Sequence, residues 1–190
     1  LEWKGRDLFR GVLGDIIDVD PAYRRAVEVA LGDALEALIA DDADGVFDAI
    51  HHLKNNHGRA GVLLLGGNRG EGNTEDLSGM PGVVGPLREF VRGDSTLAPL
   101  LSSLLRNTFL VEDLQTLFRL VPDLAAKGVV LVTTEGDLYD LSGRIAGGTT
   151  GSQDESVLGR REQIQELRSN VARDRARLAT VEGELQAEES

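Results

Sequence analysis

Residues 107–114 read NTFLVEDL, in which the apolar run TFLV is followed by the acidic pair Glu112-Asp113 and then by a leucine. A short run rich in β-branched and aromatic residues favours a buried strand. Carboxylates at the first turn of a helix accept hydrogen bonds from its unpaired amides and lie at the positive end of its dipole. The stretch therefore predicts a strand over 108–111 and a helix that starts near residue 114.

The segments on both sides of this stretch complete a helix–strand–helix–strand unit. The leucines between residues 97 and 105 recur at helical spacing, which predicts a helix before the strand. After the strand, Leu117, Phe118 and Val121 lie on one apolar helical face. Residues 129–133 then read VVLVT and predict a second buried strand.

The same order of elements occurs earlier in the chain. Asp20-Pro21 predicts the start of a helix that runs to residue 31, because Asp caps the first amides and Pro suits the first turn. A strand over 35–40, a second helix capped by Asp41 or Asp42, and a buried strand over 60–65 are expected to follow. The residues of that second helix expected to face inward are Val46, Phe47, Ile50 and Leu53. We therefore expect an α+β chain with two similar mixed α/β subdomains, followed by a coiled-coil helix.

Between the two units the chain is rich in glycine. Residues 66–73 read GGNRGEGN and residues 78–82 read SGMPG, which indicates a flexible linker. The predicted parts are subdomain I (1–66), the linker (67–82), subdomain II (83–152) and a C-terminal arm (153–190).

The C-terminal arm carries an apolar heptad seam. Its a positions are Val157, Ile164, Val171, Leu178 and Leu185. Leu167 and Val181 occupy d positions, and Asp174 interrupts the seam at another. A stripe this narrow is typical of a coiled-coil strand rather than of a helix packed on its own domain. The antiparallel partner helix is missing from this chain, so we expect the seam to be frayed or packed against another molecule.

Composition restricts the function. The net charge of −12 opposes a general nucleic-acid-binding surface, and the lack of cysteine excludes disulfides and fits a reducing cytoplasm. No run of 18 apolar residues predicts a membrane span. There is no G-K-[ST] loop, and the histidines at 51, 52 and 57 fit surface positions, so we expect no enzyme, cofactor or metal site. The chain begins Leu1-Glu2-Trp3, and we expect it to be a piece of a longer protein.

Glycines follow the second unit. Residues 138–141 and 144–146 are expected to form short strands, with Gly143 between them and Gly147-Gly148 after them. Glycine weakens a strand unless the backbone bends there or approaches something closely. The pattern agrees with simple turns, and equally with close approach of another chain's backbone at a sheet edge.

Several motifs, in the same order, resemble the hinge domain of SMC (structural maintenance of chromosomes) proteins of the bacterial, homodimeric type. The matching positions are 11–19, Tyr23, 30–32, 49–54, 58–60, 107–114, 132–138, 147–148 and 158–162. The resemblance implies a hinge that holds two coiled-coil arms together in a V or ring that entraps DNA, in chromosome condensation and segregation. It also implies a cytoplasmic, nucleoid-associated protein whose ATPase motifs belong to head domains outside this chain.

The resemblance further implies which residues act. The two-fold dimer interface would include Gly143, Arg144, Ile145, Gly147 and Gly148, although Ser142 stands where the family has a glycine. Relatives often carry lysines after the second glycine pair, whereas residues 149–154 read TTGSQD here. The alternative function, DNA binding by the hinge, would then depend on basic residues at the junction with the arm. These are Lys4, Arg6, Arg10, Arg160 and Arg161.

Overall fold

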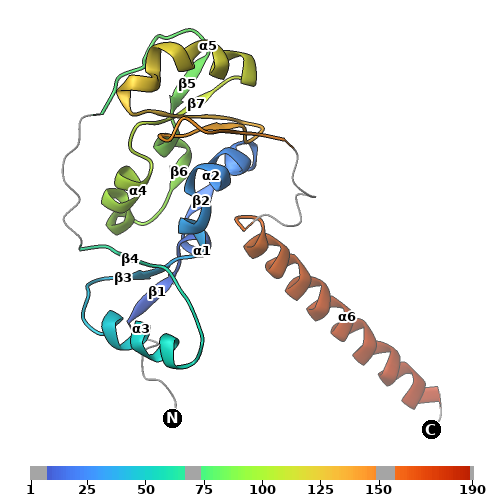
Figure 1. The fold of residues 1–190 in the computed structure, drawn as a ribbon. Helices are drawn as coiled ribbons and strands as arrows, with labels where there is room; N and C mark the ends of the chain where they lie inside the picture. Colours follow the sequence, from blue (N-terminus) through green and yellow to red (C-terminus); the bar gives the residue numbers. More distant parts are fainter. Residues whose placement is uncertain (1–7, 67–73, 149–156, 189–190) are drawn as a thin grey trace. The chain divides into compact units, whose positions relative to one another are not determined.

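The computed structural model describes residues 8–66, 74–148 and 157–188, and within the last range it describes the side chains of 157–159 and 163–178. The chain divides into two units, Leu1–Thr150 and Gly151–Ser190, and each is described by itself. The first unit holds both predicted subdomains, and the second holds the helical arm (Figure 1).

A three-stranded sheet forms the centre of the first subdomain. Its order is β1-β3-β4. Strand β1 (Phe9–Val12) runs antiparallel to β3 (Leu38–Ala40), and β3 runs parallel to β4 (Val62–Leu64). Helix α3 (Val46–Asn55) connects the two parallel strands, as a parallel crossover requires. The predicted order of elements is confirmed, but β4 is only half-buried.

Helix α3 differs from its prediction in its cap and in its buried face. Gly45 is the N-cap residue and provides no side-chain cap, while Asp41 and Asp42 make their hydrogen bonds elsewhere. Phe47, expected to face inward, is 76% exposed, whereas Ala49 is buried. Because the helix covers a sheet of only three strands, the stripe that it buries is narrow, and Phe47 lies outside it.

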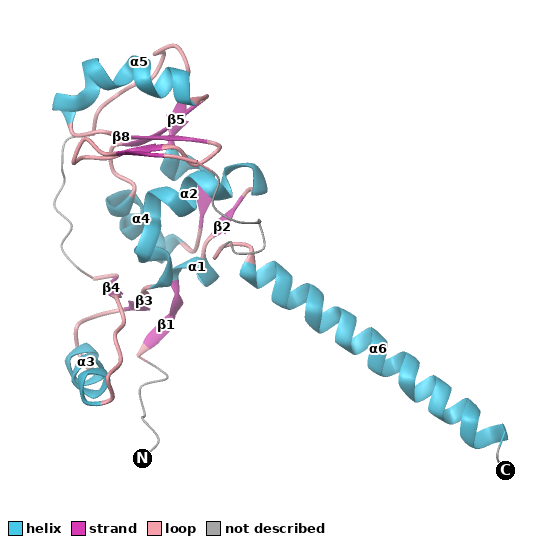
Figure 2. Ribbon diagram, turned by 45° about the vertical axis from the view of Figure 1, so that its right-hand side comes forward, coloured by secondary structure: helices cyan, strands magenta, loops and turns pink. Residues whose placement is uncertain are grey.

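A five-stranded sheet forms the centre of the second subdomain, in the order β10-β9-β8-β7-β5. Its strands are β5 (Val83–Pro86), β7 (Thr108–Val111), β8 (Val130–Thr133), β9 (Leu138–Tyr139) and β10 (Ile145–Ala146). Only β7 and β8 run parallel, and helix α5 (Leu114–Leu124) connects them. Asp113 caps α5 by accepting a hydrogen bond from the amide of Thr116 at 2.7 Å, which confirms the predicted helix start. Helix α5 covers one face of the sheet, and α2 (Arg24–Leu31) lies on the other side (Figures 1 and 2).

The two sheets repeat one arrangement. In each, an antiparallel strand with a register shift (β1 or β5) flanks a parallel pair (β3-β4 or β7-β8) joined by one helix. Strands β9 and β10 extend the second sheet beyond β8. In the described part of the chain, no strand extends the first sheet beyond β4. The two halves therefore share a core motif and differ at one edge.

Short elements between the sheets hold the two halves together. Strand β2 (Asp18–Val19) pairs antiparallel with β6 (Val91–Arg92), and the ring centroids of Tyr23 and Phe90 lie 4.4 Å apart. Helix α2, although early in the sequence, contacts β8 of the second sheet. The boundary expected at residue 66 thus lies between the two sheets, but packing contacts between the two halves cross it.

The remaining elements of the described residues are two α-helices and five short 3₁₀ helices (η). They are α1 (Leu13–Ile16), η2 (Pro21–Tyr23), η3 (Gly32–Glu36), η4 (Leu87–Phe90), η5 (Ser95–Leu97), α4 (Ala98–Leu104) and η6 (Ala125–Lys127).

Residues 74–82, the second half of the expected linker, belong to the second subdomain. Leu77 is 1% exposed and lies in the hydrophobic core beside α5 and β7, with Met80 packed against the same core. The amide of Glu75 donates to the side chain of Asn107 (2.9 Å), and the carbonyl of Pro81 accepts from Arg119 (2.6 Å). The prediction of a flexible linker over 67–82 is wrong for this half, and residues 67–73 lie outside the described residues.

The arm forms one helix, α6 (Arg160–Glu188). Its described seam residues Ile164, Leu167, Val171 and Leu178 are exposed, as expected of a seam without its partner. The helix is continuous to Glu188, so it does not show the fraying that was one of the two expectations for the seam. Packing of the seam against another molecule stays a prediction. The sequence of this helix is rich in Arg, Glu, Gln, Ala and Leu, which favour a helix without tertiary support. No helix among the described residues is long and apolar enough to cross a membrane.

Candidate functional site at the sheet edges

Strand β10 ends the five-stranded sheet. It pairs with β9 through Ile145 opposite Tyr139 and Ala146 opposite Leu138. The carbonyl of Arg144 accepts a hydrogen bond from the amide of Asp140, so the backbone of Arg144 points toward the sheet. Backbone groups of successive residues alternate between the two sides of a strand. The amide and carbonyl of Ile145 therefore point away from β9, toward the outer side of the edge.

The turn between β9 and β10 is organised by the carboxylate of Asp140. It accepts hydrogen bonds from the amide and hydroxyl of Ser142, and from the amide (3.2 Å) and Nε (2.8 Å) of Arg144. The amide of Gly143 donates to the carbonyl of Asp140 (2.9 Å), and its φ of +80° is one that glycine adopts readily. Gly143 thus allows the tight turn, Ser142 donates to the carboxylate that holds the turn, and the charge of Arg144 is paired within the hairpin.

Asp140→Asn is expected to lower the melting temperature at neutral pH. The bonds from the Ser142 hydroxyl and from Arg144 hold the pKa of Asp140 well below its usual range, so the folded hairpin favours the carboxylate. This stabilisation is complete above the unfolded pKa of about 4 and is lost as the pH falls toward the lower folded pKa. Thermal unfolding of both proteins, from neutral pH down to about pH 2, should show the difference in melting temperature shrinking. A difference that stays constant would contradict this role.

The segment after β10 contains the second glycine pair. Gly147 lies against the buried side chain of Asp137, and a Cβ at this position would overlap Oδ1 of that carboxylate. Gly148 has a φ of +109°, and a Cβ there would meet no atom within 4 Å. Of the two interpretations left open by the pattern, the turn fits Gly143. Gly147 meets a side chain of its own chain, which is neither interpretation, and close approach of another chain's backbone stays a prediction.

The hairpin formed by β9 and β10 exposes two apolar side chains. Ile145 is 41% exposed, and Leu141, at the turn before it, is also exposed. The sequence motifs did not single out Leu141, because one leucine after a short strand has no periodic signal. Strand β4, at the edge of the first sheet, carries the half-buried residues Val62, Leu63 and Leu64. Strands β10 and β4 are therefore apolar edge strands, one in each subdomain.

Of the five basic residues expected to contact DNA, Arg10 is the one whose side chain the structure describes. Arg10 forms an ion pair with Asp41 and donates to the hydroxyl of Thr96 (2.8 Å), and the bond to Asp41 raises the pKa of Arg10. This side chain therefore joins the two subdomains. Lys4 and Arg6 lie outside the described residues, as do the side chains of Arg160 and Arg161. Among the described residues, no group of three His, Cys, Asp or Glu could hold a metal ion.

Comparison with known proteins gives consistent matches. The family model described as SMC proteins Flexible Hinge Domain matches residues 6–117. The Chromosome partition protein Smc of Lactiplantibacillus plantarum is 33% identical over 93% of this chain and 16% of its own length. The protein of the same name from Halothermothrix orenii is 29% identical over 85% of this chain and 14% of its own length. The chain thus spans only a small part of the curated relatives that it matches.

Solved structures agree with these sequence matches. An asymmetric dimer of the Geobacillus stearothermophilus SMC hinge domain gives a TM-score of 0.73 at 28% identity, covering 94% of this chain and 74% of that one. The Pyrococcus furiosus Smc hinge domain with an extended coiled coil gives a TM-score of 0.64 at 26% identity, covering 97% of this chain and 65% of that one. Both the two-sheet unit and a helical extension therefore have counterparts in the solved structures.

Proposed function

Because this chain belongs to the family of SMC flexible hinge domains, we propose that two copies of it associate through their sheet edges. Strand β10 of one copy would lie beside β4 of the other, and the two-fold symmetry would form the same contact a second time. The interface would include Gly143, Arg144, Ile145, Gly147 and Gly148 of each copy, with Leu141 added by its exposure.

The difference between the two repeated sheets carries this proposal. In the second sheet, β8 is followed by β9 and β10, whereas among the residues that the structure describes the first sheet ends at the equivalent strand β4. A half-buried apolar edge strand is a template for pairing with another strand. An added strand gains main-chain hydrogen bonds, and its side chains supply specificity. Strand β10 fits this role, because the amide and carbonyl of Ile145 point outward and would bond to the main chain of β4 in the partner.

The proposed assembly joins two helical arms, because each copy continues from the sheet unit into α6. In the longer protein, such a joint would hold two arms in a V or ring that entraps DNA during chromosome partition, on the nucleoid in the cytoplasm. We propose no catalytic activity for this chain. DNA contact through Lys4, Arg6, Arg160 and Arg161 stays a prediction, and the pairing of Arg10 within the fold reduces the basic surface on which it depends.

Light scattering of the purified chain is expected to give twice the 20.4 kDa mass of one copy at about 10 µM, a concentration at which an interface of standard size is populated. A monomer at this concentration would contradict the proposal. The mass alone does not identify the contacting edges, so a second measurement is needed.

Disulfide cross-linking identifies the edges, because the chain has no cysteine of its own. A mixture of Leu63→Cys and Ile145→Cys chains should form a covalent dimer on mild oxidation, since paired strands bring Cα atoms within disulfide reach. A mixture of Leu63→Cys with Val84→Cys is the matched control, because Val84 is exposed on the opposite edge of the second sheet. Equal yields from the two mixtures would rule out the β4–β10 contact.

A further inference from the structure

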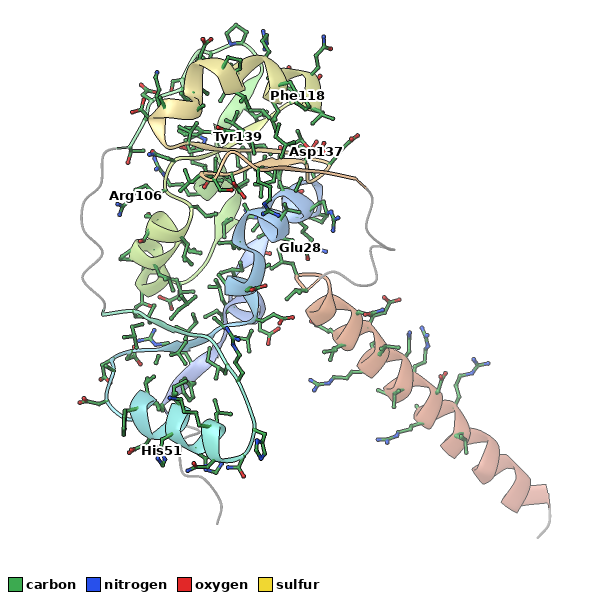
Figure 3. All side chains as sticks on the ribbon, viewed as in Figure 1. Glu28, His51, Arg106, Phe118, Asp137 and Tyr139 are labelled. Carbon is green, nitrogen blue, oxygen red and sulfur yellow. The ribbon has the colours of Figure 1, made fainter. Side chains whose placement is uncertain are left out.

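The carboxylate of Asp137 lies buried beside the chain that leaves β10. Asp137 is 8% exposed and lies in the turn between β8 and β9, directly before β9 (Figure 3). The amide of Asp137 donates to Oγ1 of Thr133 (3.0 Å), and that hydroxyl donates to Oδ2 of Asp137 (3.0 Å). The amide of Thr133 donates to the carbonyl of Asp137 (2.9 Å). These bonds hold the carboxylate in place within the turn from β8 to β9.

Gly147 provides the space that this carboxylate occupies. A Cβ at residue 147 would overlap Oδ1 of Asp137 and would lie 3.2 Å from its Cγ and 3.5 Å from its Cβ. Asp137 has a short side chain, is buried, and would have to break its bond to Thr133 to move away. A larger residue at 147 must therefore displace either a buried, hydrogen-bonded carboxylate or the backbone that follows Ala146.

We propose that Asp137 is a positioning residue for β10, and that the need for glycine at 147 arises inside the chain rather than from the partner. The buried carboxylate fixes the path of the backbone at Gly147, and this path sets how β10 is presented at the sheet edge. The proposal rests on the proposed function, because it assigns the placement of the interface strand to a residue behind that strand.

A double-mutant cycle tests this coupling. Wild type, Gly147→Ala, Asp137→Ala and the double variant are compared by sedimentation for the dimer dissociation constant and by circular dichroism for the melting temperature. Gly147→Ala is expected to weaken the dimer about tenfold in the wild-type background, within the range of coupling between contacting residues. In the Asp137→Ala background the same substitution should cost less than about threefold, because the overlapping atoms are gone.

Two controls separate this mechanism from general damage. Asp137→Asn keeps the side-chain volume, so the full cost of Gly147→Ala should persist in that background. Gly148→Ala meets no atom within 4 Å, so its cost, which comes from backbone conformation, should be equal in the wild-type and Asp137→Ala backgrounds. An equal cost of Gly147→Ala in those two backgrounds would overturn the positioning role. If the wild type proves monomeric, the proposed function fails, and the melting temperatures alone decide the coupling.

Discussion

Ile145→Lys should convert the dimer into a monomer, with a dissociation constant at least about 100-fold higher than that of the wild type. Ile145 lies on β10 with its backbone toward the outer edge and its side chain 41% exposed. In the proposed assembly the partner strand covers this side chain, and a lysine there would lose its hydration without gaining a partner charge. Two-fold symmetry places the change in both contacts, so the cost is incurred twice. Light scattering over a dilution series measures it.

Val84→Lys is the matched control for this prediction. Val84 is 46% exposed on β5, at the other edge of the same sheet, so the two substitutions change similarly exposed apolar residues on opposite edges. It is expected to leave both the mass and the melting temperature close to those of the wild type. A dimer that survives Ile145→Lys, or that is lost equally with Val84→Lys, would show that β10 is not the contacting edge.

The repeated unit of the fold was predictable from the sequence because its signals are local. Buried strands are short apolar runs such as 108–111, and a carboxylate such as Asp113 marks the helix that follows. Helix α3 shows the limit of this reasoning. Its apolar residues repeat at helical spacing, but the width of the buried stripe depends on the width of the sheet that the helix covers. The expectation that Phe47 faces inward is therefore wrong.

The site was predictable in part. The glycines that flank β10 are visible in the sequence, and the resemblance to a family assigned them to an interface. The reason for Gly147 was not visible, because Asp137 reaches it only after the hairpin has formed. The pairing of Arg10 with Asp41 and Thr96 likewise joins positions far apart in the sequence. A count of basic residues cannot distinguish such a paired arginine from one that is free to bind DNA.

Leu77→Ala should lower the free energy of unfolding by about 2–4 kcal/mol, a cost typical of truncating a fully buried leucine. Leu77 is surrounded by polar residues and glycines, so its burial has no signal in the sequence. In the fold it packs with Leu117 and Phe109 in the core between α5 and the second sheet. Urea denaturation followed by circular dichroism, at a fixed protein concentration, measures the change.

Leu141→Ala is the control for this substitution, because it removes the same atoms from an exposed leucine and should change the free energy of unfolding of the monomer by less than about 0.5 kcal/mol. Measuring both variants in the Ile145→Lys background removes any contribution from dimerisation. If Leu77→Ala also costs less than about 0.5 kcal/mol, residues 74–82 are a tether rather than part of the core. A full cost instead means that the connection between the subdomains is anchored at its second end, which limits how far the two sheets can separate.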